Sequence, residues 1–358
     1  MCGIFGVVGT GDASRLILDG LRRLEYRGYD SSGIATVVDG VIDRRRAEGK
    51  LGNLEKVLKA DPLPGTIGIG HIRWATHGAP TETNAHPHVS ARVAVVHNGI
   101  IENFRELREE MEASGHAFES ETDSEVIAHL VTDNLNAGLS PSDATGAALK
   151  RLEGAFALAL IFTGEENLLI GARRGAPLAV GHGDGEMYLG SDALALGPVT
   201  KQVSYLEEGD RVELSSDGAI IRDENDVIVE REVKYTSVGT ADMSKGNHEH
   251  YMAKEIFEQP AVIGDTLDTY FNPLSGSVAL PALPFDLAAI SKLTIIACGT
   301  SYYAAMVAKY WFEQIARVPV EVDVASEFRY REAAMPTGGL ALFISQSGET
   351  ADTLAALR

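Results

Sequence analysis

Apolar and polar positions recur along the chain with two periods, one typical of strands and one typical of helices. An apolar run at 3–8 predicts a buried strand, and apolar residues spaced three and four apart over 12–25 predict an amphipathic helix. Strands are expected at 33–38 and 41–47, joined by Asp39-Gly40, a pair typical of hairpin turns. The chain therefore begins as a mixture of strands and helices.

The same mixture continues to about residue 232. Residues 74–91 are rich in His, Pro, Thr and Asn, which predicts a long loop of the kind that is often functional. Thr122-x-x-Glu125 resembles a capping box at the start of a helix. The remaining elements predicted here are a helix, two strands, three helices and a series of short strands: 50–59, 66–72, 92–97, 102–114, 123–137, 141–152 and 154–232. Strands, then helices, then strands predict an α+β domain over 1–235.

The pattern changes in the last third of the chain. We interpret 236–284 as a linker with a connecting helix at 249–259, which Pro260 kinks or interrupts, followed by an irregular stretch at 272–284. After that, strands and helices alternate, which predicts a parallel α/β sheet. Its expected strands are 293–297, 320–324 and 340–344, and its expected helices are 301–316, 326–334 and one that starts at Thr350. Residues 285–358 thus form a second, partial domain.

Composition narrows the class of protein. The net charge of −20 over 358 residues argues against binding nucleic acid or an anionic membrane surface, both of which need clustered cations. No apolar stretch approaches the roughly 20 residues of a membrane span, and the N-terminus does not look like a signal peptide. The two cysteines, Cys2 and Cys298, do not make a disulfide framework. We therefore expect a cytoplasmic protein, most simply an enzyme.

Cys2 is the first residue with candidate chemistry. A small residue after Met1 favours removal of Met1, which would leave a thiol and a free α-amine on one residue. An α-amine has a pKa of about 7.7–8.0 and suits a base near neutral pH, and a nucleophile activated by its own amine is a known arrangement. The alternative is a small buried residue at the start of a strand.

Three further positions have both a functional and a purely structural interpretation. Arg73 ends a predicted strand, where its guanidinium can bind a carboxylate or form a surface ion pair. Asn98-Gly99 is either a turn or a pair of donors for an oxyanion. Asp123 is either a first-turn helix residue or a partner for an ammonium group.

The predicted parallel sheet suggests a phosphate site. Two of its strands end in hydroxyl-rich turns that open helices, and backbone N–H groups at helix N-termini suit a phosphate. The residues concerned are Thr300, Ser301, Ser345, Gln346, Ser347 and Thr350. His86-x-His88 and His248-x-His250 have no matching Cys or acidic set, so we interpret them as loop histidines and expect no metal.

Several segments in order carry a resemblance to a known family. In the first domain they are 2–6, 24–31, 70–78, 84–88, 97–103 and 121–125, and in the second 297–302, 325–331 and 345–350. Together they resemble glutamine–fructose-6-phosphate aminotransferases (isomerising), from the glutaminase domain to the start of the first sugar-isomerase (SIS) domain. Each motif is moderately specific, whereas the ordered set is very specific.

The resemblance implies a fold and a set of roles. The fold is an N-terminal-nucleophile hydrolase with four layers, αββα, followed by a partial α/β SIS domain. Cys2 would attack L-glutamine, and Asn98 and the Gly99 N–H would form the oxyanion hole. Arg73 and Asp123 would bind the α-carboxylate and α-ammonium of glutamine. Other residues carried over near this pocket are Trp74, Thr76, His77, Arg27 and His86.

The resemblance also implies binding partners, and two alternative functions remain open. It implies no cofactor, a homodimer in the full-length enzyme, and fructose 6-phosphate as the acceptor. The family's isomerising residues lie beyond Arg358, so we expect this chain to hydrolyse glutamine, bind the sugar phosphate weakly or not at all, and form no amino sugar. The alternatives are another class II glutamine amidotransferase or a non-catalytic sugar-phosphate sensor.

Overall fold

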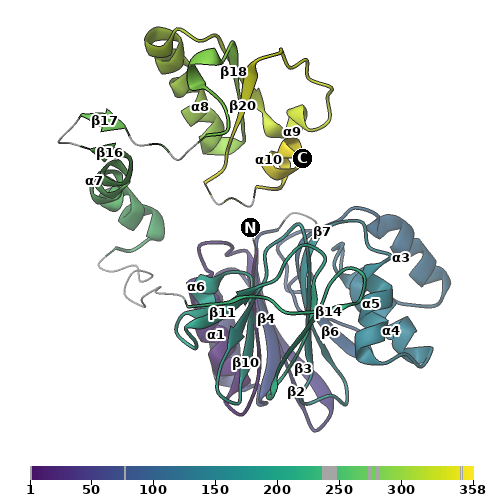
Figure 1. Ribbon diagram of the computed structural model, residues 1–358. Helices are drawn as coiled ribbons and strands as arrows, with labels where there is room; N and C mark the ends of the chain where they lie inside the picture. Colours follow the sequence, from purple (N-terminus) through teal and green to yellow (C-terminus); the bar gives the residue numbers. More distant parts are fainter. Residues whose placement is uncertain are drawn as a thin grey trace. The chain divides into compact units, whose positions relative to one another are not determined.

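The computed structural model of this chain describes residues 2–75, 78–235, 248–272, 276–278, 280, 283–346, 348 and 350–358 (Figure 1). Two compact units are present, unit 1 over 1–244 and unit 2 over 245–358. Met1 and three predicted site residues, Thr76, His77 and Ser347, lie outside the described residues.

Unit 1 contains two antiparallel sheets. One has eight strands in the order β15-β11-β9-β10-β1-β4-β2-β3, and the other has seven in the order β14-β13-β12-β8-β7-β6-β5. The strands of the first sheet are β1 Gly3–Val8, β2 Ser31–Val38, β3 Val41–Glu48, β4 Ile67–Arg73, β9 Ala179–His182, β10 Met187–Gly190, β11 Gln202–Tyr205 and β15 Val233–Tyr235. Those of the second are β5 His88–Val89, β6 Val93–Ile101, β7 Gly154–Phe162, β8 Leu169–Arg174, β12 Arg211–Ser215, β13 Gly218–Arg222 and β14 Ile228–Val229.

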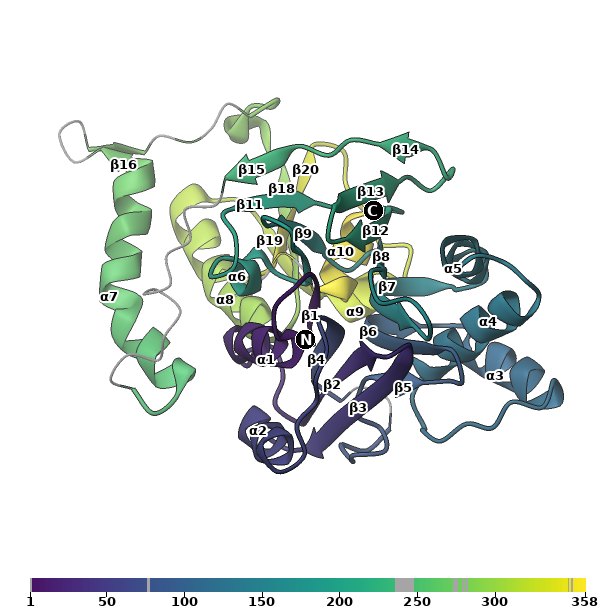
Figure 2. The ribbon, with the colours of Figure 1, turned by 90° about the horizontal axis from the view of Figure 1, so that it is seen from below.

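Helices cover the outer face of each sheet, so the predicted αββα order is confirmed. Figures 1 and 2 show α1 on one side of the paired sheets and α3, α4 and α5 on the other. Separate apolar clusters fill the space between the sheets and the space beneath each helical layer. The helices are α1 Ala13–Arg23, α2 Leu51–Ala60, α3 Phe104–Ala113, α4 Glu125–Asn136, α5 Pro141–Leu149 and α6 Ala193–Leu196.

The inner faces of three strands are rows of alternate residues, because side chains alternate between the two faces of a sheet. Ile4 and Val8 of β1 face the core between the sheets, as do Ile67 and Ile69 of β4 and Ala94 and Val96 of β6. By the same alternation, the next residues outward on these rows are Cys2, His71 and Asn98. At one end of the core between the sheets, polar side chains therefore replace apolar ones.

Two local predictions in unit 1 are wrong. Glu125 does not complete a capping box with Thr122; its carboxylate accepts from the backbone N–H groups of Glu119 and Ser120, at 2.8 and 2.7 Å. The Glu125 carboxylate is thus bonded to the loop before α4 and not to the N-terminus of the helix. The predicted strand 92–97 continues to Ile101, since Asn98 and Gly99 keep pairing with β7 instead of turning.

Unit 2 contains the predicted parallel sheet, with strands in the order β19-β18-β20. Leu293, Ile295, Ala305 and Val320 form its small buried cluster. Its elements are α7 Tyr251–Tyr270, β16 Phe271–Asn272, β17 Ser277–Val278, β18 Lys292–Ala297, α8 Gly299–Trp311, β19 Val320–Val324, α9 Ala325–Phe328, β20 Gly339–Ile344 and α10 Ala351–Leu357, with a 3₁₀ turn at Leu287–Ala289 and a π-helical turn at Phe312–Ala316.

Two helices of unit 2 differ in length from the prediction. α7 runs ten residues past Pro260 and does not stop there. A proline lacks only one backbone donor, so a helix can continue past it when the neighbouring turns stay hydrogen bonded. α9 ends at Phe328, well before the predicted 334. Beyond it, the backbone N–H groups of Tyr330 and Arg331 each donate to the carbonyl three residues earlier, which forms tight turns. None of the described helices is both long and apolar enough to cross a bilayer.

Candidate active site

Strand pairing in the eight-stranded sheet places the thiol of Cys2. β1 pairs with β4 so that Gly3 lies opposite Ile72, which brings Cys2 beside the end of β4. The backbone N–H of Trp74 donates to Cys2 Sγ at 3.3 Å, and the thiol donates to the Trp74 carbonyl at 3.5 Å. The predicted nucleophile is therefore held at the point where the chain leaves β4.

The second sheet supplies the predicted oxyanion donors. Asn98 Nδ2 donates to the backbone carbonyl of Cys2 at 3.2 Å, although Cys2 directly precedes β1 of the other sheet. Gly99 has φ +130°, and a Cβ there would lie 2.0 Å from the Ala155 carbonyl oxygen. Only glycine fits that position, and Gly99 is exposed beside Asn98.

Asp123 and Arg73 are both buried, with 4% and 3% of their surfaces exposed. Asp123 Oδ2 accepts from the Ile101 N–H at 2.8 Å, which fixes the carboxylate at the end of β6. The Arg73 guanidinium donates to the carbonyls of Gly78 and Ala79 at 3.2 and 3.1 Å. A buried guanidinium and a buried carboxylate are thus each held by hydrogen bonds to the backbone.

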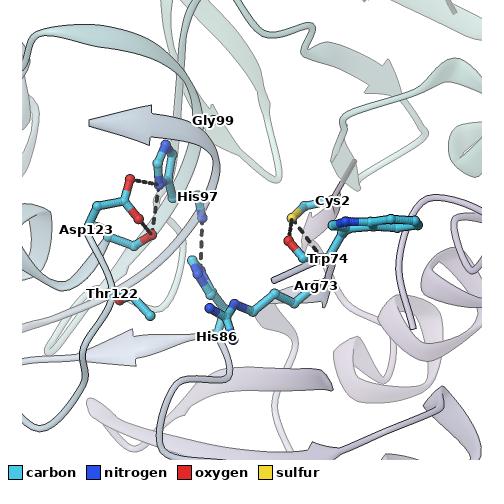
Figure 3. Close-up of a pocket in the computed structure, with 9 residues that line it drawn as sticks. Cys2, Arg73, Trp74, His86, His97, Gly99, Thr122 and Asp123 are labelled. Carbon is cyan, nitrogen blue, oxygen red and sulfur yellow. Dashed lines mark hydrogen bonds and ion pairs between the residues drawn. The ribbon is translucent and has the colours of Figure 1, made fainter. Parts of the chain in front are cut away.

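These residues line one pocket (Figure 3). Figure 3 shows Cys2, Arg73 and Trp74 on one side, Asp123 on the other, and His86 between them. The full lining is Cys2, Arg73, Trp74, His86, His97, Gly99, Thr122, Asp123 and Ser124. Four residues predicted for glutamine chemistry, Cys2, Arg73, Gly99 and Asp123, therefore meet, and Asn98 reaches the same place through its bond to Cys2.

The thiol is not pre-ionised in this pocket. Burial raises the pKa of Cys2, although the hydrogen bond from Trp74 opposes the shift, Arg73 lowers it and Asp123 raises it further. A thiol with a raised pKa is a weak nucleophile at neutral pH until a base removes its proton. The site therefore needs a base, which the α-amine of Cys2 would supply.

Buried histidines next to the pocket were missed as site residues, except for His86. The rings of His71 and His86 are stacked with their centroids 4.2 Å apart, and His88 meets His86 edge-on at 4.5 Å. Burial lowers the pKa of His71 to about 3 and that of His86 well below its usual value, so both rings are neutral. The concentration of histidines in the loop predicted at 74–91 was the available signal.

Two other residues carried over from the resemblance lie at the margin. Trp74 is 44% exposed and meets the Tyr29 ring edge-on at 5.5 Å. Arg27 is buried and pairs with Asp192 at 2.8 Å, and it does not line the pocket. Arg27 is thus part of the support around α1 and not part of the pocket wall.

In unit 2, the predicted phosphate-binding turns meet at one edge of the sheet. Ala297 and Ile344 end adjacent parallel strands in register, so the turns after them are neighbours. Thr300 and Ser301 stand in the first turn of α8. Ser345 Oγ accepts from the Gly348 N–H at 3.0 Å and lies 3.0 Å from Thr350 Oγ1, and Gln346 is exposed.

Across residues 2–75, 78–235 and the described parts of unit 2, no group of three or more His, Cys, Asp or Glu side chains is arranged to hold an ion. His86 and His88 are buried against other rings, and His248 stacks on Phe257 with the ring centroids 5.4 Å apart.

Family models match both units. A glutamine amidotransferase domain matches residues 71–198, and a SIS domain matches residues 286–358. The first match includes Arg73, Asn98 and Asp123, and the second includes both hydroxyl-rich turns.

Curated relatives match the whole chain. A glutamine–fructose-6-phosphate aminotransferase (isomerizing) of Zymomonas mobilis is 62% identical over 358 residues, and one of Brucella suis is 60% identical over 358 residues. Both matches cover 100% of this chain and 59% of the relative. The chain thus spans somewhat more than half the length of these relatives.

Solved structures share the fold. A glutamine phosphoribosylpyrophosphate amidotransferase from B. subtilis matches with a TM-score of 0.57 and 18% identity, over 97% of this chain and 69% of that one. An allosteric regulatory enzyme of purine biosynthesis matches with a TM-score of 0.55 and 26% identity, over 62% of this chain and 49% of that one. The predicted N-terminal-nucleophile fold of unit 1 is confirmed.

Proposed function

From the premise that this chain belongs to the glutamine–fructose-6-phosphate aminotransferase family, we propose that unit 1 hydrolyses L-glutamine to glutamate and ammonia. The convergence of Cys2, Asn98, Gly99, Arg73 and Asp123 on one pocket carries this proposal. Hydrolysis of the side-chain amide of an amino acid requires a nucleophile and oxyanion donors, and recognition of its α-carboxylate and α-ammonium requires a cation and a carboxylate. The pocket contains all of these groups. A sensor that only bound a sugar phosphate would need none of them.

The first step is attack by Cys2 Sγ on the side-chain amide carbon of glutamine. After removal of Met1, the α-amine of Cys2 takes the thiol proton and passes it to the leaving nitrogen, which departs as ammonia. The product is a thioester. Water then adds to the thioester carbon while the amine takes a proton from it, and as the C–S bond breaks the amine returns that proton to the leaving sulfur, which gives glutamate and the free thiol.

Both additions place negative charge on the former amide oxygen. Asn98 Nδ2 and the Gly99 N–H are the donors for that charge in this proposal. The φ of +130° at Gly99 sets the direction of its amide, and the hydrogen bond to Cys2 sets that of Asn98. Donors held in place before the reaction stabilise the transition state without reorganising.

Arg73 and Asp123 orient the substrate. A planar guanidinium binds a carboxylate through paired hydrogen bonds, and the buried Asp123 carboxylate suits the α-ammonium. Trp74 lies at the mouth of the same pocket, and we propose it as a further contact, with Thr76 and His77 in the adjoining loop.

Unit 2 is our proposed binding site for the sugar phosphate that accepts the ammonia. We propose that Thr300, Ser301, Ser345, Gln346, Ser347 and Thr350 bind the phosphate of fructose 6-phosphate through hydroxyl and amide donors at two helix starts. A protein of the relatives' full length would then transfer ammonia to the sugar and form glucosamine 6-phosphate. That protein would be a cytoplasmic homodimer, as the family resemblance predicts.

The test is glutamine hydrolysis by the purified protein, with and without fructose 6-phosphate, followed by assays of glutamate and glucosamine 6-phosphate. Glutamate formation that is lost in Cys2→Ala supports the proposal. Equal glutamate formation by both proteins would assign the activity to another group. Stimulation by a phosphoribosyl substrate but not by fructose 6-phosphate would favour a different class II amidotransferase.

A further inference from the structure

Asn98 has a side-chain amide whose two ends have opposite chemistry. Its Nδ2 end can donate to an oxyanion, whereas its Oδ1 end would repel one. A rotation of the amide by half a turn exchanges the two ends with little change in shape. An oxyanion donor of this kind therefore requires a neighbour that distinguishes the nitrogen from the oxygen.

His71 is that neighbour. Its Nε2 lies 3.0 Å from the backbone carbonyl of His97 and 3.0 Å from Asn98 Oδ1. A carbonyl can only accept, so Nε2 must carry a proton and act as the donor. The Asn98 atom that shares this proton must then be the oxygen, which leaves Nδ2 directed at the Cys2 carbonyl, 3.2 Å away.

The state of the His71 ring agrees with this. His71 is fully buried, and burial lowers its pKa to about 3, so the ring carries one proton at neutral pH. Its Nδ1 is buried and has no hydrogen-bond partner among the described residues. A proton on Nδ1 would be an unsatisfied buried donor, so the single proton belongs on Nε2.

The ring is also held from its other side. His71 stacks on His86, whose Nδ1 accepts from the His97 backbone N–H at 3.2 Å. The two histidines therefore bind both polar groups of the His97 backbone: His86 accepts from its N–H, and His71 donates to its carbonyl. His97 precedes Asn98 on β6, so this contact fixes the strand on which the oxyanion donor stands.

The bond from His71 to Asn98 also crosses between the sheets. Cys2 and His71 belong to the eight-stranded sheet, and Asn98 to the seven-stranded one. The core between the sheets is otherwise apolar, and apolar contacts have no strong directional preference. Hydrogen bonds are directional, so they restrict the position of the donor relative to the thiol more narrowly than apolar contacts do.

We propose that His71 is a positioning residue, which orients the Asn98 Nδ2 group toward the oxygen that gains negative charge and aligns the oxyanion donor of one sheet with the nucleophile of the other. The inference rests on the proposed glutaminase function. His71 does not touch the substrate in this proposal and transfers no proton. Substitution of His71 should therefore lower kcat, and this loss should depend on the presence of Asn98.

The kinetic test compares His71→Phe, His71→Gln and the matched control His182→Phe, a histidine of β9 outside the pocket. We expect His71→Phe to lower kcat for glutamine by about 10–100-fold with KM changed less than about twofold, the range found for groups that orient others. Gln offers a donor near the position of Nε2 and should recover part of that loss. His182→Phe should match the unsubstituted protein.

A double-mutant cycle with Asn98→Ala separates positioning from general support of the fold. If His71 acts through Asn98, His71→Phe should have little further effect on kcat once Asn98 is alanine. Multiplicative losses in the double mutant, or a KM that rises as much as kcat falls, would overturn the proposal. Thermal melting of each variant shows whether it is folded.

Nitrogen-15 NMR of the histidine rings tests the hydrogen bond without using activity. We expect His71 to remain neutral with its proton on Nε2 from pH 8 to pH 5, and its Nε2 signal to shift in Asn98→Ala. A ring protonated on Nδ1 contradicts the proposal. Because this measurement needs no turnover, a protein that fails to hydrolyse glutamine would refute the proposed function while the NMR result still decides the role of His71.

Discussion

The two units present their polar groups in opposite ways. In unit 1, Arg73, Asn98 and Asp123 are buried, at 3, 7 and 4% exposure, and every one has a fixed hydrogen-bond partner. In unit 2, Thr300 and Gln346 are exposed at the open edge of a three-stranded sheet. The first site is built into a core, and the second lies on a surface.

The difference agrees with what each proposed site would have to do. A developing oxyanion is stabilised best by donors that are already in place and shielded from water. A phosphate arrives charged and hydrated, and surface hydroxyls with helix N–H groups can bind it without being buried. Variants of unit 1 should therefore have large effects on rate, whereas variants of unit 2 should have small effects on affinity.

The largest effect is expected at Cys2. Cys2→Ala removes the nucleophile and should lower glutamine hydrolysis by about four orders of magnitude or more, as removal of a nucleophile does elsewhere. Glutamate release measures it, and Cys298→Ala is the control. Blocking the α-amine, for example by retaining Met1, should also abolish activity. Full activity with Met1 present would contradict the proposed base.

Asn98→Ala should come next, with a loss of kcat of roughly 10²–10³-fold and a nearly unchanged KM for glutamine. The donor acts on charge that develops after binding, which is why the two constants separate. Asn103→Ala, just beyond the end of β6 and bonded to the backbone of Arg151 and Glu153, is the matched control. A normal kcat in Asn98→Ala would leave Asn98 as a strand residue only.

Arg73→Lys and Asp123→Asn test recognition instead of chemistry. Each weakens one charge-assisted contact worth about 1.5–3 kcal/mol, so KM for glutamine should rise about 10–100-fold. Steady-state kinetics at saturating glutamine distinguishes this from a fall in kcat. An unchanged KM in both variants would place the α-carboxylate and α-ammonium elsewhere.

Acid should destabilise unit 1 more than unit 2. The folded-state pKa of His71 is about 3, below its usual 6.5, so the unfolded chain binds the extra proton between those pH values. Stability is then complete above pH 6.5 and is lost as the pH falls toward 3, by about 2 kcal/mol at pH 5 for such a ring. His86 and His88 have pKa values shifted in the same direction by burial and add to the loss.

Hydrogen exchange followed by mass spectrometry at pH 7 and pH 5, corrected for intrinsic rates, measures this for each unit. Unit 2 contains only His248 and His250, and neither is buried, so its protection should change little. Equal loss of protection in both units would show that the buried histidines do not control the acid response.

The smallest effect is expected in unit 2. Ser345→Ala removes one hydroxyl and its bond to the Gly348 N–H, so binding of fructose 6-phosphate should weaken about 2–10-fold, with glutamine hydrolysis unchanged. Calorimetric titration measures the affinity. Ser291→Ala removes a hydroxyl from the opposite end of β18 and should have no effect. Identical affinities for the two variants would argue against the phosphate site.

Hydrophobic periodicity and turn residues in the sequence predicted most strands and helices of both units. Local rules were sufficient for β1, whose apolar run is short and buried, and for the hairpin at Asp39 and Gly40, where both residues have positive φ. They failed where a tertiary contact competed with a local one. Glu125 is the example, since its carboxylate binds the loop at Glu119 and Ser120 and not the helix end.

Motifs in the sequence predicted a chemical role for Cys2, Arg73, Asn98 and Asp123, because thiol, guanidinium, amide and carboxylate each have few roles. Alternation along each strand even shows that Cys2, His71 and Asn98 continue inward-facing rows. Only the stacking of the two sheets decides which of these rows lie next to one another. The contacts between the sheets are apolar and join residues far apart in the sequence. The role of His71 follows from that stacking, since its two acceptors, the His97 carbonyl and Asn98 Oδ1, stand on a strand of the other sheet.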